Sequence, residues 1–248
     1  MDRTFILAGD GFALAILRHK FQSPRATVEK IEGQFYLRMT SEFWTGDDDT
    51  DLVAAEDELR QMNGIAKMLH PRFTSVRIAG ISVKNPVTGK MNSVIRGGRG
   101  ICEIAIGVFA KPAQLYSNTD SIVLQDTTTD AEEIRQLCDE HEHLTRAVQI
   151  YGALPHEWRE LSMVVDAIKE HHGGGKELEK KDYYPPKLKD FTGTANSFRA
   201  IKLGARHGWT EQKGGGVKEP TITLNEAKGL IRKLMEDTIA SLKKKTKD

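Results

Sequence analysis

The sequence predicts an α+β protein: a mostly antiparallel sheet with one packed helix, followed by an α-helical C-terminal part. Three observations predict this class. Alternating or β-branched apolar runs, separated by turn residues, occupy most of residues 1–125. One amphipathic helical stripe lies among them, and the apolar residues after residue 126 recur at helical spacing. We therefore expect a sheet domain over residues 1–125 and a helical domain over residues 126–248.

The strands are predicted from period-2 patterns and turn residues. Residues 26–40 predict a hairpin whose tight turn is Glu32-Gly33. Residues 76–84 predict a strand with a bulge at Gly80, and residues 91–95 its returning partner. Residues 101–109 are apolar on both faces, which predicts a central or covered strand. The short apolar run 12–17 is expected to be a core segment.

The helices are predicted from apolar residues spaced three and four apart. The first covers residues 51–70, with the acidic run 47–51 at its N-terminus, where the helix dipole favours negative charge. Three more are expected after residue 126, and residues 176–190 are expected to connect them. These three are a stripe over 134–151 behind a Thr129/Glu132 capping box, a helix from Pro155 to the glycines at 173–175, and a last helix opened by Thr223 and Glu226. A short helical segment is expected around 195–205.

Composition excludes several classes of protein. The 248 residues carry a net charge of +1 and are 39% hydrophobic, which excludes a disordered chain and argues against a protein that coats nucleic acid. Two cysteines, Cys102 and Cys138, exclude a disulfide scaffold and a four-cysteine zinc site. No apolar run approaches the ~18 residues of a membrane span, and no signal peptide is evident. We therefore expect a mature cytoplasmic protein without membrane contact, cofactor or metal.

Two segments are candidate sites for an anion or nucleic acid. In the run 96–100, backbone N–H groups of consecutive glycines and two arginines can bind an anion; the alternative is a solvated hairpin connection. The segment 196–208 mixes Asn, Arg, Lys, His and Gly, and can orient a phosphate or carboxylate; the alternative is a docking segment in which the Asn caps a turn. The residues assigned to anion or nucleic-acid binding are Arg96, Arg99, Asn196, Arg199 and Arg206.

The run 139–143 concentrates five titratable residues. A metal site is one interpretation of it, but on a helix only Asp139 and His143 have the i, i+4 spacing of ligands, and two ligands do not make a site. His141 lies on the apolar stripe, which is more typical of a hydrogen-bonded core residue.

Arg135 and His141 form an Arg-x5-His spacing, which resembles the signature of the HEPN-type helical ribonucleases. The resemblance implies a pair at a dimer cleft, in which the His and Arg serve acid/base and phosphate-binding roles. Gln136 follows the arginine here, where that family often has Asn or Asp. On this hypothesis the catalytic residues are Arg135, His141 and, from the segment 196–208, His207.

Four short segments together resemble a family of uncharacterised bacterial proteins. They are Met62–Ala66, Leu154–Trp158, Asn196–Gly208 and Thr223–Lys228. The recurring pieces of that family are an Asn-Gly-Ile-Ala helix, a Trp-bearing helix ending in Gly-Gly, an Asn…Ala-Arg-His segment and a C-terminal helix. The resemblance implies a bacterial cytosolic origin and brings no activity with it.

Two functional hypotheses follow. Because no complete catalytic constellation is present, the first is a cytosolic bacterial protein that acts by binding a protein partner or by self-association. Complementary acidic and basic regions of the chain fit such a surface. The alternative is a HEPN-like ribonuclease or another phosphate- or nucleic-acid-handling enzyme, for example in phage defence, with nucleic acid as a partner.

Overall fold

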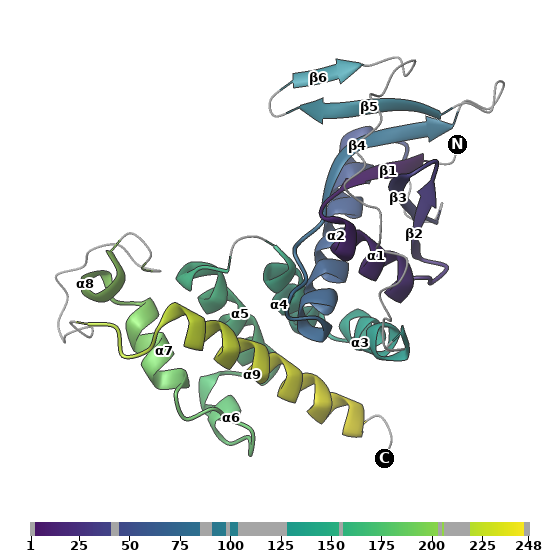
Figure 1. The fold of residues 1–248 in the computed structure, drawn as a ribbon. Helices are drawn as coiled ribbons and strands as arrows, with labels where there is room; N and C mark the ends of the chain where they lie inside the picture. Colours follow the sequence, from purple (N-terminus) through teal and green to yellow (C-terminus); the bar gives the residue numbers. More distant parts are fainter. Residues whose placement is uncertain are drawn as a thin grey trace. The chain divides into compact units, whose positions relative to one another are not determined.

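The computed structural model describes residues 3–40, 45–84, 91–97, 100–103, 128–153, 156–202, 205 and 219–245. The backbone forms two compact units, residues 1–133 and 134–248. The fold is α+β, with an antiparallel sheet in the first unit and helices dominating the second (Figure 1). Within the described ranges, every helix is too short or too polar to traverse a lipid bilayer.

Six strands form one sheet in the order β2-β3-β1-β4-β5-β6, and each neighbouring pair is antiparallel (Figure 1). The strands are β1 (Arg3–Ala8), β2 (Ala26–Ile31), β3 (Gln34–Met39), β4 (Arg77–Lys84), β5 (Met91–Gly97) and β6 (Gly100–Glu103).

The strand β1 lies between β3 and β4, and the sequence patterns did not predict it. Thr4 and Ile6 are buried on one face of this strand, and Phe5 and Leu7 on the other. Because both faces are covered, the strand lacks the alternation from which a half-exposed strand is predicted.

Two predicted local features of the sheet are confirmed. The turn between β2 and β3 is Glu32-Gly33, with φ angles of 50° and 87°, as a type I′ hairpin turn requires. Between β1 and β4 the register shifts, because Ile6 pairs with Gly80 whereas Leu7 pairs with Ile78. The intervening Ala79 is therefore the bulged residue, directly beside the predicted position.

The described part of the strand predicted over residues 101–109 is the strand β6. Residues 101–103 belong to β6, which comes last in the strand order and pairs with β5. Residues 104–109 lie outside the described ranges.

Among the described residues of the range 1–125 there are two helices where one was expected, α1 (Gly11–Lys20) and α2 (Asp48–Leu69). Each begins at an aspartate: the Asp10 carboxylate accepts from the Ala13 N–H at 2.9 Å, and the Asp47 carboxylate accepts from the Thr50 N–H at 2.9 Å. The apolar run 12–17 lies in α1, which packs against β2 and α2. The predicted helix over 51–70 is confirmed as α2.

A buried asparagine connects α2 to Val76, the residue directly before β4. The Asn63 side-chain amide donates to the Val76 carbonyl at 2.8 Å and accepts from the Val76 N–H at 3.0 Å. Asn63 is only 3% exposed, so these two bonds satisfy backbone groups that water does not reach.

The helical part of the chain contains more helices than the three or four expected. They are α3 (Thr128–Glu140), α4 (Glu142–Gly152), α5 (Trp158–His171), α6 (Gly175–Glu179), α7 (Leu188–Ala195), α8 (Phe198–Ile201) and α9 (Leu224–Lys245). The expected connector 176–190 contains most of α6 and the start of α7. Thr129 lies inside the first turn of α3, so it is not the N-cap that its capping-box pattern predicted.

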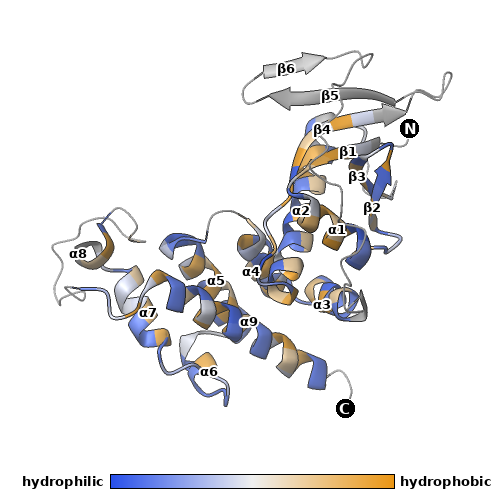
Figure 2. Ribbon diagram, in the orientation of Figure 1, coloured by the Kyte–Doolittle hydropathy of each residue, from blue (hydrophilic) through white to orange (hydrophobic). Residues whose placement is uncertain are grey.

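The helices α4 and α5 form an antiparallel hairpin at the centre of the second unit. His141 contacts His171 at one end of the hairpin, and Tyr151 stacks on His156 at the other. Both α7 and α9 also pack against α5. Hydrophobic and hydrophilic residues alternate round each of these helices (Figure 2), and their apolar sides form the core of the unit.

The last helix begins as predicted. The Thr223 hydroxyl accepts from the Glu226 N–H at 3.2 Å, and the Glu226 carboxylate accepts from the Thr223 N–H at 2.9 Å. This reciprocal pair is the predicted capping box.

Candidate functional site

The two described residues of the predicted catalytic set lie in different elements of the chain. Arg135 lies in α3 with 3% of its surface exposed, which leaves no room for a phosphate at its guanidinium. His141 is the half-buried N-cap of α4, and its extended backbone ends the continuous helical stripe predicted over 134–151. His207 lies outside the described residues.

The predicted anion-binding residues that the structure describes also lie in different elements. Asn196 is the exposed C-cap of α7, and its N–H donates to the Thr192 carbonyl at 3.1 Å. Arg96 lies in β5 and Arg199 in α8. The residues Arg99 and Arg206 lie outside the described ranges. Gly97 pairs with Gly100, so the run 96–100 connects β5 to β6.

The lengths of the helices separate His141 from the segment that begins at Asn196. His141 lies at the C-terminal end of α5, whereas Trp158 at its N-terminal end stacks on Phe191 of α7 with ring centroids 6.0 Å apart. The 14 residues of α5 span about 20 Å. Since Asn196 follows α7 directly, it and His141 lie toward opposite ends of the hairpin.

Four side chains make a histidine cluster at the first of these ends: His141, His171, His172 and Tyr183. The ring of His171 contacts that of His141 at 5.2 Å and that of His172 at 4.9 Å, both edge to face. The His172 Nε2 atom lies 2.9 Å from the Tyr183 hydroxyl. Burial raises the pKa of the Tyr183 phenol above its usual range, so this hydroxyl stays protonated near neutral pH.

The backbone after α5 holds the cluster in place. Gly173 and Gly174 have φ angles of 81° and 122°, which side chains with a Cβ rarely adopt. Their N–H groups donate to the Glu170 and Lys169 carbonyls at 3.0 and 2.8 Å, closing the C-terminus of α5 beside His172. The sequence signal for the cluster was the His-His pair directly before these glycines, which none of the predicted motifs included.

A charged network borders the histidine cluster on the outer side of the α4–α5 hairpin. The Glu170 carboxylate lies 3.1 Å from the Arg146 guanidinium and 3.6 Å from the His143 Nδ1 atom. These three side chains are about half exposed, so the ion pairs contribute little to stability and remain accessible to a partner.

The exposed face of α5 continues from this network toward its N-terminus. We define the α5 stripe as Arg159, Met163, Asp166 and Glu170, whose spacings of four, three and four place them within an arc of about 60°. Met163 is 40% exposed, and charged side chains lie on both sides of it along the helix. Asp166 lies 3.9 Å from the Lys169 ammonium.

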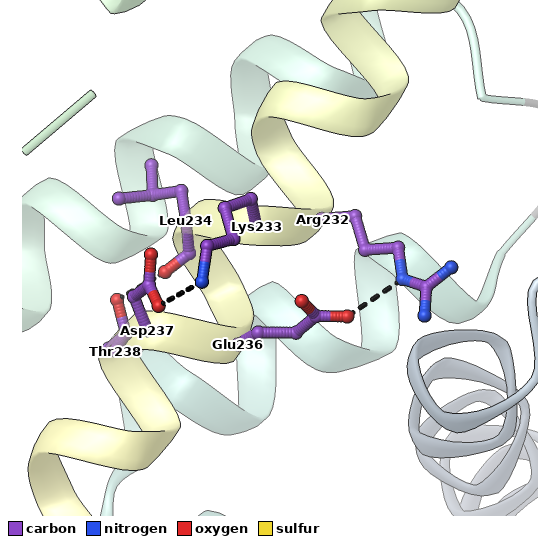
Figure 3. A network of polar contacts seen from close by, with 6 residues as sticks. All are labelled: Arg232, Lys233, Leu234, Glu236, Asp237 and Thr238. Carbon is purple, nitrogen blue, oxygen red and sulfur yellow. Dashed lines mark hydrogen bonds and ion pairs between the residues drawn. The ribbon is translucent and has the colours of Figure 1, made fainter. Parts of the chain in front are cut away.

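The polar face of α9 shows a different arrangement. Arg232 and Lys233 each reach the carboxylate four residues further along, at 2.8 Å on Glu236 and 2.7 Å on Asp237 (Figure 3). The charges on this face therefore neutralise one another within the helix. Arg159 has no such ion pair with another described residue, so the α5 stripe presents a cation at one end and the Glu170 network at the other.

Among the described residues, no group of three or more His, Cys, Asp or Glu side chains is arranged to hold a metal ion. Comparisons with protein-family models, with curated proteins and with solved structures find no match to this chain.

Proposed function

We propose that this protein acts by association, with a protein partner or with a second copy of itself, through the outer face of the α4–α5 hairpin. The observation that carries the proposal is the α5 stripe, in which Met163 is exposed between charged side chains of both signs. Protein interfaces commonly have such an arrangement, an apolar centre within a polar rim.

The position of Met163 matters more than its exposure. Single exposed apolar residues are common on monomeric proteins, and Val53 on α2 is more exposed, at 56%. Met163, however, lies midway along a helix whose opposite side forms the core of the unit, so the helix is rigidly held. Its flexible thioether can also adapt to the shape of a partner.

We place this association in the bacterial cytoplasm. The buried Cys138 is a thiol rather than half of a disulfide, which is typical of proteins that fold in a reducing compartment. Neither the predicted catalytic residues nor a cofactor has a role in the proposed function.

The substitution Met163→Asp tests the proposal. Light scattering coupled to size exclusion measures self-association, and mass spectrometry of proteins retained by the tagged chain measures partner binding. We expect Met163→Asp to weaken association at least about tenfold, because it places a charge at the centre of the interface. The matched control Val53→Asp makes the same kind of change at an exposed apolar position of another helix and should have no effect. Equal effects of the two substitutions, or no association of the wild type in either assay, would refute the proposal.

The alternative function is a ribonuclease or another phosphate-handling enzyme. One observation favours it: the contact of His141 with His171 in a partly exposed cluster. On this alternative, His141→Ala abolishes cleavage of an RNA substrate, whereas His19→Ala, at an exposed position on α1, leaves the rate unchanged. The burial of Arg135 argues against it. Cleavage that persists in His141→Ala, or that the wild type lacks, would eliminate the alternative.

A further inference from the structure

We infer that the α5 stripe pairs with the same stripe of a second copy of this chain, antiparallel, about a two-fold axis that passes between residues 164 and 165. The inference rests on the proposed function and specifies its partner.

When two copies of the α5 stripe run antiparallel, the charges at the ends of one copy face opposite charges on the other. Arg159 lies as far before the midpoint 164/165 as Glu170 lies after it. An antiparallel partner therefore places Glu170 of the second copy opposite Arg159, and the two-fold axis makes this ion pair occur twice.

The centre of the stripe fits the same arrangement. Met163 lies opposite Asp166 of the second copy, and the ammonium of Lys169 lies 3.9 Å from the Asp166 carboxylate within each chain. The negative charge of Asp166 is thereby partly neutralised where the Met163 side chain packs beside it. The two Met163 side chains lie near the axis and provide the apolar contact.

Electrostatics also excludes the parallel alternative. A parallel pair of α5 helices would place Arg159 against Arg159 and Glu170 against Glu170, so like charges would meet at both ends. Like charges facing each other across an interface oppose that orientation. The sequence of the stripe therefore selects the antiparallel orientation.

The size of the stripe sets the expected affinity. The helix rises about 16 Å from Arg159 to Glu170, so one helix pair buries less than the ~1,200 Å² of a standard interface. We therefore expect a dimer with a dissociation constant in the micromolar range, which assembles and separates readily.

Charge reversal at the two ends of the stripe tests the inference. In homodimers of Arg159→Glu or of Glu170→Arg, like charges face each other twice, and we expect dimerisation to weaken about tenfold or more. An equimolar mixture of the two variants provides the complementary test. A chain with Arg159→Glu presents Glu at both ends of its stripe, and a chain with Glu170→Arg presents Arg at both ends. When the two meet, both facing pairs are opposite in charge, so the mixture should form a heterodimer of nearly wild-type affinity. The double variant in one chain restores a cation at one end and an anion at the other, and it should regain its homodimer.

The measurements are light scattering and analytical ultracentrifugation from about 1 to 200 µM, a range that brackets the expected micromolar dissociation constant. Circular dichroism checks that each variant folds, and Lys180→Glu, an exposed reversal beside α6, is the matched control. A wild type that stays monomeric throughout this range would overturn the inference, while a partner lost on Met163→Asp would still support the proposed function. The inference would also be overturned if the wild type dimerises but neither charge reversal weakens the dimer, or if the mixed variants form no heterodimer. In either case the protein would still self-associate, but through another arrangement.

Discussion

The substitution Lys67→Met should stabilise the protein at neutral pH. Lys67 lies near the C-terminus of α2 and is only 8% exposed. Burial lowers the pKa of its ammonium from 10.5 to about 8, because the low-dielectric surroundings disfavour the charged form. Below pH 8 the partly desolvated charge of Lys67 therefore lowers the free energy of unfolding.

The magnitude follows from the difference between the folded and unfolded pKa. A difference of this size corresponds to about 3 kcal/mol of unfolding free energy. Lys67 also has an interaction that methionine would lose, so we expect Lys67→Met to raise the free energy of unfolding by less than this, about 2 kcal/mol at pH 7. Methionine has nearly the same length and no charge, so it can fill the same space.

The dependence on pH has a definite sign. Below pH 8, Lys67 is charged in both states and the full cost is present. Between pH 8 and 10.5 the folded state releases its proton first, so the cost falls and the advantage of the Lys67→Met variant over the wild type should shrink. Urea unfolding at pH 7 and at about pH 9.5 measures this difference, and Lys30→Met, at an exposed lysine of β2, should change stability by less than about 0.5 kcal/mol. Destabilisation by Lys67→Met at pH 7, or a gain that stays the same at the higher pH, would refute the reasoning.

Three further substitutions test the local structure. Asn63→Leu leaves both backbone groups of Val76 buried without their partner, so the free energy of unfolding measured in urea should fall by about 2–3 kcal/mol. An unchanged free energy of unfolding would contradict the role assigned to these two hydrogen bonds. Thr223→Ala removes the capping box and should cost about 1 kcal/mol, whereas Thr223→Ser should retain most of it; equal losses would contradict the cap. Glu32→Asn should raise the melting temperature by stabilising the hairpin about 0.5–1 kcal/mol, since Asn-Gly favours the type I′ turn; a lower melting temperature would contradict the turn assignment.

The features predicted correctly from the sequence are those that neighbouring residues determine. The Glu32-Gly33 turn, the helix α2 and the capping box at Thr223 each depend on residues within a short stretch of chain. Such features have a local physical cause, so a pattern in the sequence is sufficient to find them.

The features that were missed depend on tertiary surroundings. β1 is buried on both faces, and only its position between β3 and β4 reveals it as a strand. α1 had a local signal, because Asp10 precedes an apolar run, but that run is buried round most of the helix. The break between α3 and α4 at His141 has no Pro or Gly from which it could be predicted. At this break the Thr145 hydroxyl donates to the Cys138 carbonyl and contacts the His141 carbonyl.

The candidate site was predictable only in part. The spacing of residues along one helix pointed to His141 but paired it with Arg135, six positions earlier. The structure instead places His141 beside His171, which is thirty positions later in sequence and next to it in the hairpin. Contacts between helices determine this cluster, and helical spacing along one segment cannot identify them.

The central position of β1 also affects the order in which the chain can fold during synthesis. β1 is made before the other strands of the sheet, and its neighbour β4 begins about 70 residues after β1 ends. At about 5–20 residues per second, the ribosome needs roughly 4 to 14 s to make that intervening chain. During this interval the strand β1, with its apolar Phe5 and Leu7, lacks one of its two neighbouring strands. The nascent chain therefore exposes an apolar strand that chaperones can bind before β4 is synthesised.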